Sequence, residues 1–299
     1  MGEKNRSMAA FFDLDGTLMP LPSLEQRFFR VLRYRKAIPA KNYLLWLKEA
    51  ARLLPRGINA IAQANKMYLK GVHSLDESDT ENRNHFRGHK SGHQSEGQAP
   101  APSSRRARRN PRWPVPLFFR EAVERAAWHA MQGHAIVLVS GTLEPLAKAA
   151  AQAMEAELAS RGFAAEIRVC ATRLEEIDGR WTGRIAGEAM FGEAKARAVK
   201  KLAEEMRLDL ARSHAYGDGA NDQWMLAEAG KPVAVNPSCK LARIARKRGW
   251  PVLRWNEARS QTQRHREHGE KEEREQKRPA NETLPREIQE RSLRAVRWP

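Results

Sequence analysis

Three short apolar runs in this chain of 299 residues each end in a polar loop that contains glycine. The runs span residues 9–14, 135–139 and 213–216, and stretches with helical spacing of apolar residues lie between them. Apolar runs of this kind are typical of parallel strands buried on both faces, and strands that alternate with helices favour a doubly wound sheet. The sequence therefore predicts an α/β fold in which the polar loops follow the strands of a parallel sheet.

The first run ends in two carboxylates, Asp13 and Asp15, and a Gly-Thr turn follows at once. Two residues apart on an extended chain, the acids point to the same side. Like charges held that close repel each other, so the pair favours a bound cation or a shared proton. By themselves the two residues fit a metal site and an ordinary acidic turn equally well.

The loop after the third run adds Asp218 and Asp222. Since the carboxyl ends of parallel strands meet at one edge of a sheet, we expect these acids to lie beside Asp13 and Asp15. Four carboxylates without a cation would repel each other strongly, and Mg²⁺ is a hard ion that prefers oxygen ligands. The sequence therefore predicts a magnesium site at this edge.

The second run ends at Ser140, Gly141 and Thr142, whose hydroxyl and backbone N–H groups suit a phosphate. The two hydroxyls could instead cap the helix predicted from Leu143. Lys195 lies near the start of another predicted helix, where its charge could offset an anionic substrate. A solvated surface lysine is the alternative for that position.

These segments resemble, in order along the chain, the four motifs of the haloacid dehalogenase superfamily of phosphohydrolases. The resemblance is strongest to its phosphoserine-phosphatase-like branch, which carries a helical cap after the first motif. The matching segments are Asp13-Leu14-Asp15-Gly16-Thr17, Val139-Ser140-Gly141-Thr142, Gly192-Glu193-Ala194-Lys195 and Gly217-Asp218-Gly219-Ala220-Asn221-Asp222.

The resemblance implies a role for each residue. Asp13 would be the nucleophile that forms an aspartyl-phosphate, and Asp15 would be the general acid and then the general base. Mg²⁺ would bind Asp13, the backbone carbonyl of Asp15, and Asp218, with Asp222 in support. Lys195 would hold phosphoryl oxygens. The remaining substrate-binding or phosphate-binding residues would be Thr17, Ser140, Gly141, Thr142 and Asn221.

Composition and helical spacing divide the chain into regions. We expect residues 1–20 and 113–255 to form the α/β core and residues 21–72 a helical cap, with helices at 23–36, 41–54 and 58–69. Residues 73–112 have almost no large apolar side chains, which predicts a loose insertion. The alternative is that the local sequence has been altered, for example by a compensated frame shift. Residues 256–299 are expected to form a charged, flexible tail, and residues 168–185 a hairpin.

The cap sequence bears on the substrate. Phosphoserine phosphatases usually have Ser at the position of Gly16 and a Glu shortly beyond it. In this chain residues 19–22 occupy the region of that Glu, and the nearest acid is Glu25. The cap is instead basic and apolar, which favours a larger or amphiphilic phosphate ester. Residues 1–72 carry 13 basic and 5 acidic side chains, within a chain of net charge +17.

That charge leaves a second class of function open, a basic module that binds nucleic acid or an anionic membrane surface. No recognised nucleic-acid motif is present, which argues against a nucleic-acid partner, whereas peripheral membrane contact remains open. Phosphotransfer to an acceptor other than water is a third hypothesis. Two cysteines, Cys170 and Cys239, and no signal-like N-terminus favour the cytoplasm. Three histidines, His129, His134 and His214, are expected at the surface or at strand edges rather than as ligands.

Overall fold

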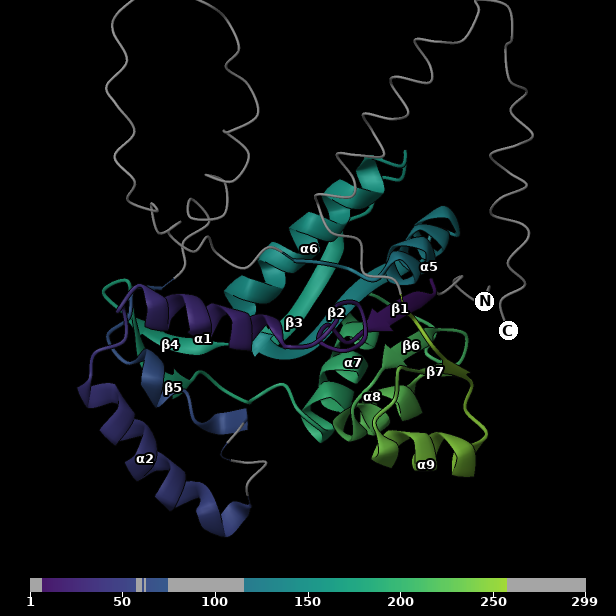
Figure 1. The fold of residues 1–299 in the computed structure, drawn as a ribbon. Coiled ribbons are helices and arrows are strands. Elements are labelled where there is room, and N and C mark those ends of the chain that lie inside the picture. The colour runs from purple at the N-terminus through teal and green to yellow at the C-terminus, as the bar shows by residue number, and fades with distance from the viewer. Residues whose placement is uncertain (1–6, 58–60, 62, 75–115, 257–299) are drawn as a thin grey trace, which may run out of the picture.

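The computed structural model describes residues 7–57, 61, 63–74 and 116–256 (Figure 1). Its centre is a six-stranded sheet in the order β3-β2-β1-β6-β7-β8, and every pairing in it is parallel. The strands are β1 (Ala9–Phe12), β2 (Ala135–Leu143), β3 (Ile167–Thr172), β6 (His214–Gly217), β7 (Lys231–Val235) and β8 (Val252–Leu253). The predicted parallel α/β sheet is confirmed.

Helices cover both faces of the sheet, as a doubly wound fold requires. They are α5 (Arg120–Met131), α6 (Glu144–Ala159), α7 (Glu193–Glu205), α8 (Gln223–Glu228) and α9 (Cys239–Arg248). Because successive residues of a strand face opposite sides, Ala10 and Phe12 join a core with α5 and α6. Ala9 and Phe11 join a second core with α7, α8 and α9. Burial on both faces explains why β1 is apolar throughout.

The central position of β1 brings the predicted loops together. Phe12 is paired with Leu138 of β2 on one side and with Tyr216 of β6 on the other. The chain segments that follow these three residues therefore leave the sheet at the same edge. This register places the loops after β1 and β6 beside the last residues of β2, so the three predicted polar segments meet at one edge.

The segment after β1 forms a layer beside that edge. It contains α1 (Leu24–Tyr34), α2 (Lys41–Leu53) and two short 3₁₀ helices, η1 (Leu54–Arg56) and η2 (Met67–Leu69). The buried Asn42 side chain joins α2 to the end of this segment, because its Nδ2 donates to the carbonyls of Tyr68 at 3.1 Å and Lys70 at 2.7 Å. Of the helix predicted at 58–69, positions 58–60 and 62 lie outside the described residues, and 67–69 form η2.

The predicted hairpin at 168–185 is wrong in its first half. Residues 167–172 form β3, which pairs in parallel with β2, and the hairpin consists of β4 (Leu174–Ile177) and β5 (Arg180–Ile185). The hairpin adjoins the chain after η2, since Gly71 N donates to Trp181 O at 2.7 Å and Trp181 N donates to Val72 O at 3.0 Å. The Trp181 ring is buried and meets Phe28 of α1 edge-on. The hairpin thus connects the sheet to the helices predicted as a cap.

Two further expectations concern regions that the structure hardly describes. Of the predicted loose insertion only residues 73 and 74 are described, and of the predicted tail only residue 256. Both expectations, like the assignment of the chain to a core and a cap, stay predictions. Among the described residues, no helix combines the length and apolar composition needed to cross a membrane.

Candidate active site

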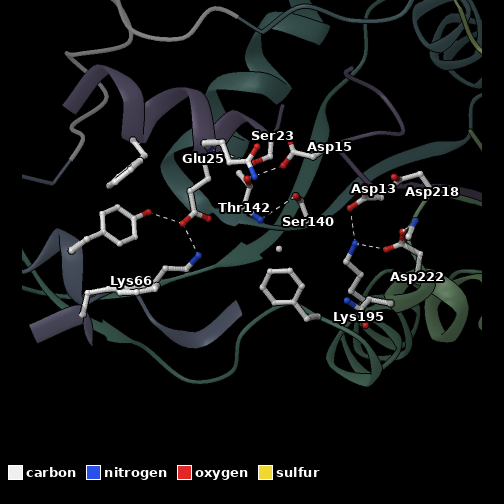
Figure 2. A pocket seen from close by; sticks show the side chains of 18 of the residues that line it. Asp13, Asp15, Ser23, Glu25, Lys66, Ser140, Thr142, Lys195, Asp218 and Asp222 are labelled. Carbon is white, nitrogen blue, oxygen red and sulfur yellow. Dashed lines mark hydrogen bonds and ion pairs between the residues drawn. The ribbon is translucent and has the colours of Figure 1, made fainter. Parts of the chain in front are cut away.

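Asp13 and Asp15 stand where β1 ends. Asp13 N donates to Tyr216 O at 2.9 Å, which extends the β1–β6 ladder by one residue and fixes the backbone of the acid. The side chain of Asp13 is buried and faces a cavity of about 660 Å³ (Figure 2). The cavity lies at the edge of the sheet where the three loops meet, and it is the setting for the other predicted residues.

Three carboxylates converge in this cavity. Oxygens of Asp13, Asp218 and Asp222 all lie within 4.8 Å of one another. Glycines make this approach possible: a Cβ on Gly16, whose φ is +90°, would lie 2.2 Å from Asp218 Oδ2, and one on Gly217 would lie 2.5 Å from Asp222 Cβ. The loops are therefore shaped to hold the acids close together, and hard oxygen donors in this arrangement fit a divalent metal ion.

Lys195 is placed between two of these acids. It lies in the first turn of α7, its side chain is 3% exposed, and its Nζ is 2.6 Å from Asp13 Oδ1 and 2.6 Å from Asp222 Oδ1. The alternative of a solvated surface lysine is therefore wrong. Asp222 is fixed from its other side as well, because Gly219 N donates to its Oδ2 at 2.8 Å.

One lysine does not balance the negative charge of the cluster. Burial raises the pKa of Asp13 to about 7, against the opposing effect of Lys195, and Asp222 adds to the rise. Burial, followed by the charges of Asp13 and Asp222, raises the pKa of Asp218 to about 8. Burial would lower the pKa of Lys195, but the two carboxylates outweigh it and the pKa is raised. The charge balance of the described residues thus leaves room for a further cation.

Asp15 points away from that cluster and is held by two donors. Leu24 N donates to Oδ1 at 2.7 Å, and the hydroxyl of Thr142 donates to Oδ2 at 2.9 Å. Burial raises the pKa of the Asp15 carboxyl, and the hydrogen bonds from Leu24 and Thr142 oppose the rise. The two acids of the first loop therefore have different surroundings. The predicted contribution of the Asp15 carbonyl to a metal site stays a prediction.

Ser140, Gly141 and Thr142 line the same cavity, but they lie within β2, which continues to Leu143, and not in a loop after residue 139 as the sequence predicts. The pairing of β2 with β3 shifts its register between Ser140 and Leu143. Neither hydroxyl caps α6, whose N-cap is Leu143 with no side-chain hydrogen bond, so the capping alternative is wrong. Gly141 lies under an aromatic ring, since a Cβ there would be 2.2 Å from Phe191 Cε1. Only a glycine leaves space for that ring beside Ser140.

Every predicted site residue except Thr17 lines the cavity. The Thr17 side chain is fully buried, and its hydroxyl has no hydrogen-bond partner among the described residues. The structure therefore corrects the expectation that Thr17 binds the substrate or its phosphate. Asn221 does line the cavity, next to Asp222.

Sequence reasoning missed a polar group on the side of the cavity formed by α1 and η2. Glu25 Oε1 accepts hydrogen bonds from Lys66 Nζ at 2.5 Å and from the hydroxyl of Tyr68 at 2.6 Å, and all three residues line the cavity (Figure 2). Lys66 is 3% exposed in its side chain. Burial raises the pKa of Tyr68 well above its usual value. Nothing in the local sequence around Lys66 signals such a role.

The histidine expectation is also corrected, outside the cavity. His129, His134 and His214 are all buried, and their ring nitrogens lie within 4.8 Å of one another. His129 Nδ1 is 2.8 Å from His134 Nδ1, and His129 Nε2 is 2.9 Å from the hydroxyl of Tyr216. These hydrogen bonds occupy both ring nitrogens of His129, as in a satisfied core histidine.

The sequence matches the model of haloacid dehalogenase-like hydrolases over residues 10–227. This chain belongs to the haloacid dehalogenase-like hydrolase family. The match includes all four motif segments, and it confirms the resemblance that the sequence motifs predict.

Curated relatives within this family include two proteins of Mycobacterium tuberculosis. One, named phosphoserine phosphatase, is 46% identical over 81 residues, which are 27% of this chain and 26% of the relative. The other, named as a probable phosphatase, is 36% identical over 139 residues, which are 46% of this chain and 45% of the relative. The chain therefore spans between about a quarter and a half of the length of these relatives.

A solved structure extends the likeness over more of the fold. A protein of unknown function from Bordetella pertussis Tohama I is 28% identical, with a TM-score of 0.55, and the match covers 83% of this chain and 99% of that one. The sheet and the helices around it thus have a counterpart in a solved structure.

Proposed function

We propose that this family member is a Mg²⁺-dependent phosphomonoester hydrolase that acts on a small or amphiphilic phosphorylated substrate through an aspartyl-phosphate. The observation that carries the proposal is the position of Asp13. Its carboxylate faces the cavity between the Lys195 ammonium and the Asp218 and Asp222 carboxylates. A phosphatase named as such among the curated relatives supports the same reaction class.

In the first step an oxygen of Asp13 attacks the phosphorus, and the bond from phosphorus to the alcohol oxygen breaks. Asp15, held by Leu24 N and the Thr142 hydroxyl, gives its proton to the leaving alkoxide. Water then attacks the phosphorus and transfers a proton to Asp15. The Asp13–phosphorus bond breaks, and inorganic phosphate leaves.

Asp13, Asp218 and Asp222 are the residues that would hold Mg²⁺, with the carbonyl of Asp15. The ion would supply positive charge beside the transferring phosphoryl group, which carries much of the catalysis in such reactions. Lys195 positions Asp13 and Asp222 through its two ion pairs. Ser140 and the Gly141 amide are placed to donate to phosphoryl oxygens, which would further stabilise the transition state.

The test is hydrolysis of para-nitrophenyl phosphate with Mg²⁺. Asp13→Asn should abolish turnover, because an amide cannot form the covalent intermediate, and EDTA should abolish it until Mg²⁺ is restored. Asp178→Asn is the matched control, since Asp178 is exposed in the β4–β5 turn and should keep full activity. Turnover retained by Asp13→Asn would refute the proposal, and release of free phosphate distinguishes hydrolysis from phosphotransfer.

Contact with an anionic membrane surface is kept as a second candidate on one observation. In α2 the side chains of Leu44 and Leu47 are 70% and 58% exposed, on a helix that also carries Lys41 and Lys48. Exposed apolar and basic side chains on one helix are typical of interfacial helices. Sedimentation with vesicles that contain anionic lipid tests this, and Asp13→Asn should leave any binding unchanged.

A further inference from the structure

The cavity extends well beyond the place where a phosphoryl group would react. Its volume of about 660 Å³ lies in the range of roughly 300–1,000 Å³ that is usual for drug-sized ligands. Figure 2 shows Asp13, Asp218, Asp222 and Lys195 on one side, and Glu25 and Lys66 on the other. A substrate whose phosphate meets Asp13 therefore has space for a large alcohol portion that reaches toward Glu25.

Aromatic side chains form much of the cavity lining. Phe191 lies against Gly141 at the phosphate end. Phe29, Tyr43 and Trp46 line the cavity from α1 and α2. Aromatic rings offer large flat surfaces to a ligand and favour edge or offset contacts with other rings. This lining favours a flat, apolar body over the short polar chain of an amino-acid phosphate.

At the far end, Glu25 is fixed and keeps one oxygen available. Both of its contacts, from Lys66 and from the Tyr68 hydroxyl, are made to Oε1. Among the described residues, no hydrogen bond is made to Oε2. Tyr68 is in turn held by an edge contact with Phe29, with ring centroids 5.1 Å apart. The carboxylate is therefore positioned to accept one hydrogen bond from a ligand.

We propose that this enzyme selects phosphate monoesters of alcohols with a flat apolar body that ends in a hydrogen-bond donor, which Glu25 Oε2 accepts. The inference rests on the proposed hydrolase function and names its substrate class. Glu25 and Lys66 neutralise each other, so the far end does not attract a second anionic group. The selected donor is accordingly an amine, amide or ring N–H.

A matched pair of substrates tests the role of Glu25. Para-(aminomethyl)benzyl phosphate carries the donor, and para-ethylbenzyl phosphate has nearly the same shape without it. The wild-type enzyme should favour the amine in kcat/KM by about tenfold or more, the usual effect of a hydrogen bond to a charged group. Glu25→Gln should lose most of this preference, measured as the ratio of kcat/KM for the two esters within each variant. Glu49→Gln, in α2 and outside the cavity lining, is the control and should keep the preference.

A second variant tests the aromatic wall without touching a buried ion pair. Tyr43 lines the cavity and is 42% exposed, so Tyr43→Ala should fold normally. It should raise KM for both benzyl esters about 2- to 10-fold with little change in kcat, in keeping with the usual energy of one aromatic contact. Tyr34→Ala removes a similarly exposed tyrosine, on α1, that does not line the cavity, and should have no effect on KM.

The outcomes separate this inference from the proposed function. Phosphoserine hydrolysed as well as the benzyl esters, or an amine preference that Glu25→Gln leaves intact, overturns the inference while the hydrolase function stands. A KM that Tyr43→Ala leaves unchanged contradicts the aromatic wall in the same way. If these esters are not hydrolysed while para-nitrophenyl phosphate is hydrolysed in an Asp13-dependent reaction, the inference is wrong and the hydrolase function stands. If para-nitrophenyl phosphate is not hydrolysed either, the proposed function itself is wrong.

Discussion

Replacing Gly16 by alanine tests whether the loop after β1 is shaped to hold Asp218. Gly16 has a φ of +90°, and a Cβ built there lies 2.2 Å from Asp218 Oδ2 and 2.5 Å from its Cγ. The substitution therefore has two separable effects. It strains the backbone, and it forces the Asp218 carboxylate away from Asp13 and Asp222.

The two effects differ in size and in what they change. A residue other than glycine at positive φ costs about 1–3 kcal/mol in the free energy of unfolding, or roughly 2–4 °C in Tm per kcal/mol at this size. Ordinary contacts begin at 3.4 Å, so a contact of 2.2 Å requires a displacement of Asp218 by about 1 Å. A misplacement of that size can reduce catalysis by about 100-fold, and it should also weaken Mg²⁺ binding.

Gly162→Ala is the control for the strain alone. Gly162 has a φ of +84°, and a Cβ there meets nothing within 4 Å. Both variants should lose a similar amount of Tm, while only Gly16→Ala should lose kcat/KM and need more Mg²⁺ for half-maximal activity. If Gly16→Ala kept kcat/KM within about twofold of Gly162→Ala, the reasoning that Gly16 positions Asp218 for catalysis would be refuted.

Two further predictions concern buried charge. Lys195→Met leaves the buried carboxylates of Asp13 and Asp222 without their ion-pair partner, at a cost of roughly 3–5 kcal/mol in the free energy of unfolding, and should lower Tm by at least about 6 °C. Added Mg²⁺ should restore part of this loss, and a Tm that Mg²⁺ leaves unchanged contradicts the prediction. Burial lowers the pKa of His129 to about 2 and of His214 to about 4, so both stay neutral in the fold while the unfolded chain gains protons below pH 6.5. The two histidines should therefore lower the free energy of unfolding by about 2 kcal/mol between pH 6.5 and 5.5, while Asp13 and Asp218, whose pKa values are raised, act in the opposite direction. The share of His214 is measured with urea as the difference between the wild type and His214→Asn, which should change by about 1 kcal/mol over this interval, and a constant difference contradicts it.

The sequence predicts those strands that are buried on both faces of the sheet. Residues 9–12 and 135–139 lie in the middle of the sheet, so an unbroken apolar run identifies them as parallel strands. β3 lies at the edge of the sheet, and Arg168 on it is exposed. An edge strand with one open side has the same mixed pattern as a hairpin strand, and only its pairing with β2 distinguishes them.

The histidines illustrate a different limit. His129 lies in the last turn of α5, His134 precedes β2 and His214 begins β6, so their neighbours become known only when three elements pack together. Each of them has polar or small residues close by in sequence, which is why a surface position is the natural expectation. Their burial is a tertiary property, decided by the ring contacts with one another and with Tyr216.

The same contrast explains why the reaction centre is predictable from this sequence and the far end of its cavity is not. Asp13 and Asp218 each directly follow a strand, and Ser140 lies near the end of β2, so the topology alone fixes their meeting place. The ion pair of Glu25 with Lys66 spans 41 residues and depends on how η2 returns toward α1. A pairing of that kind has no local pattern and can change while the strand ends stay as they are. Two chains with the same four motifs can therefore share the phosphoryl-transfer step and still select different alcohols, and in this chain Glu25 and the rings around it make that selection.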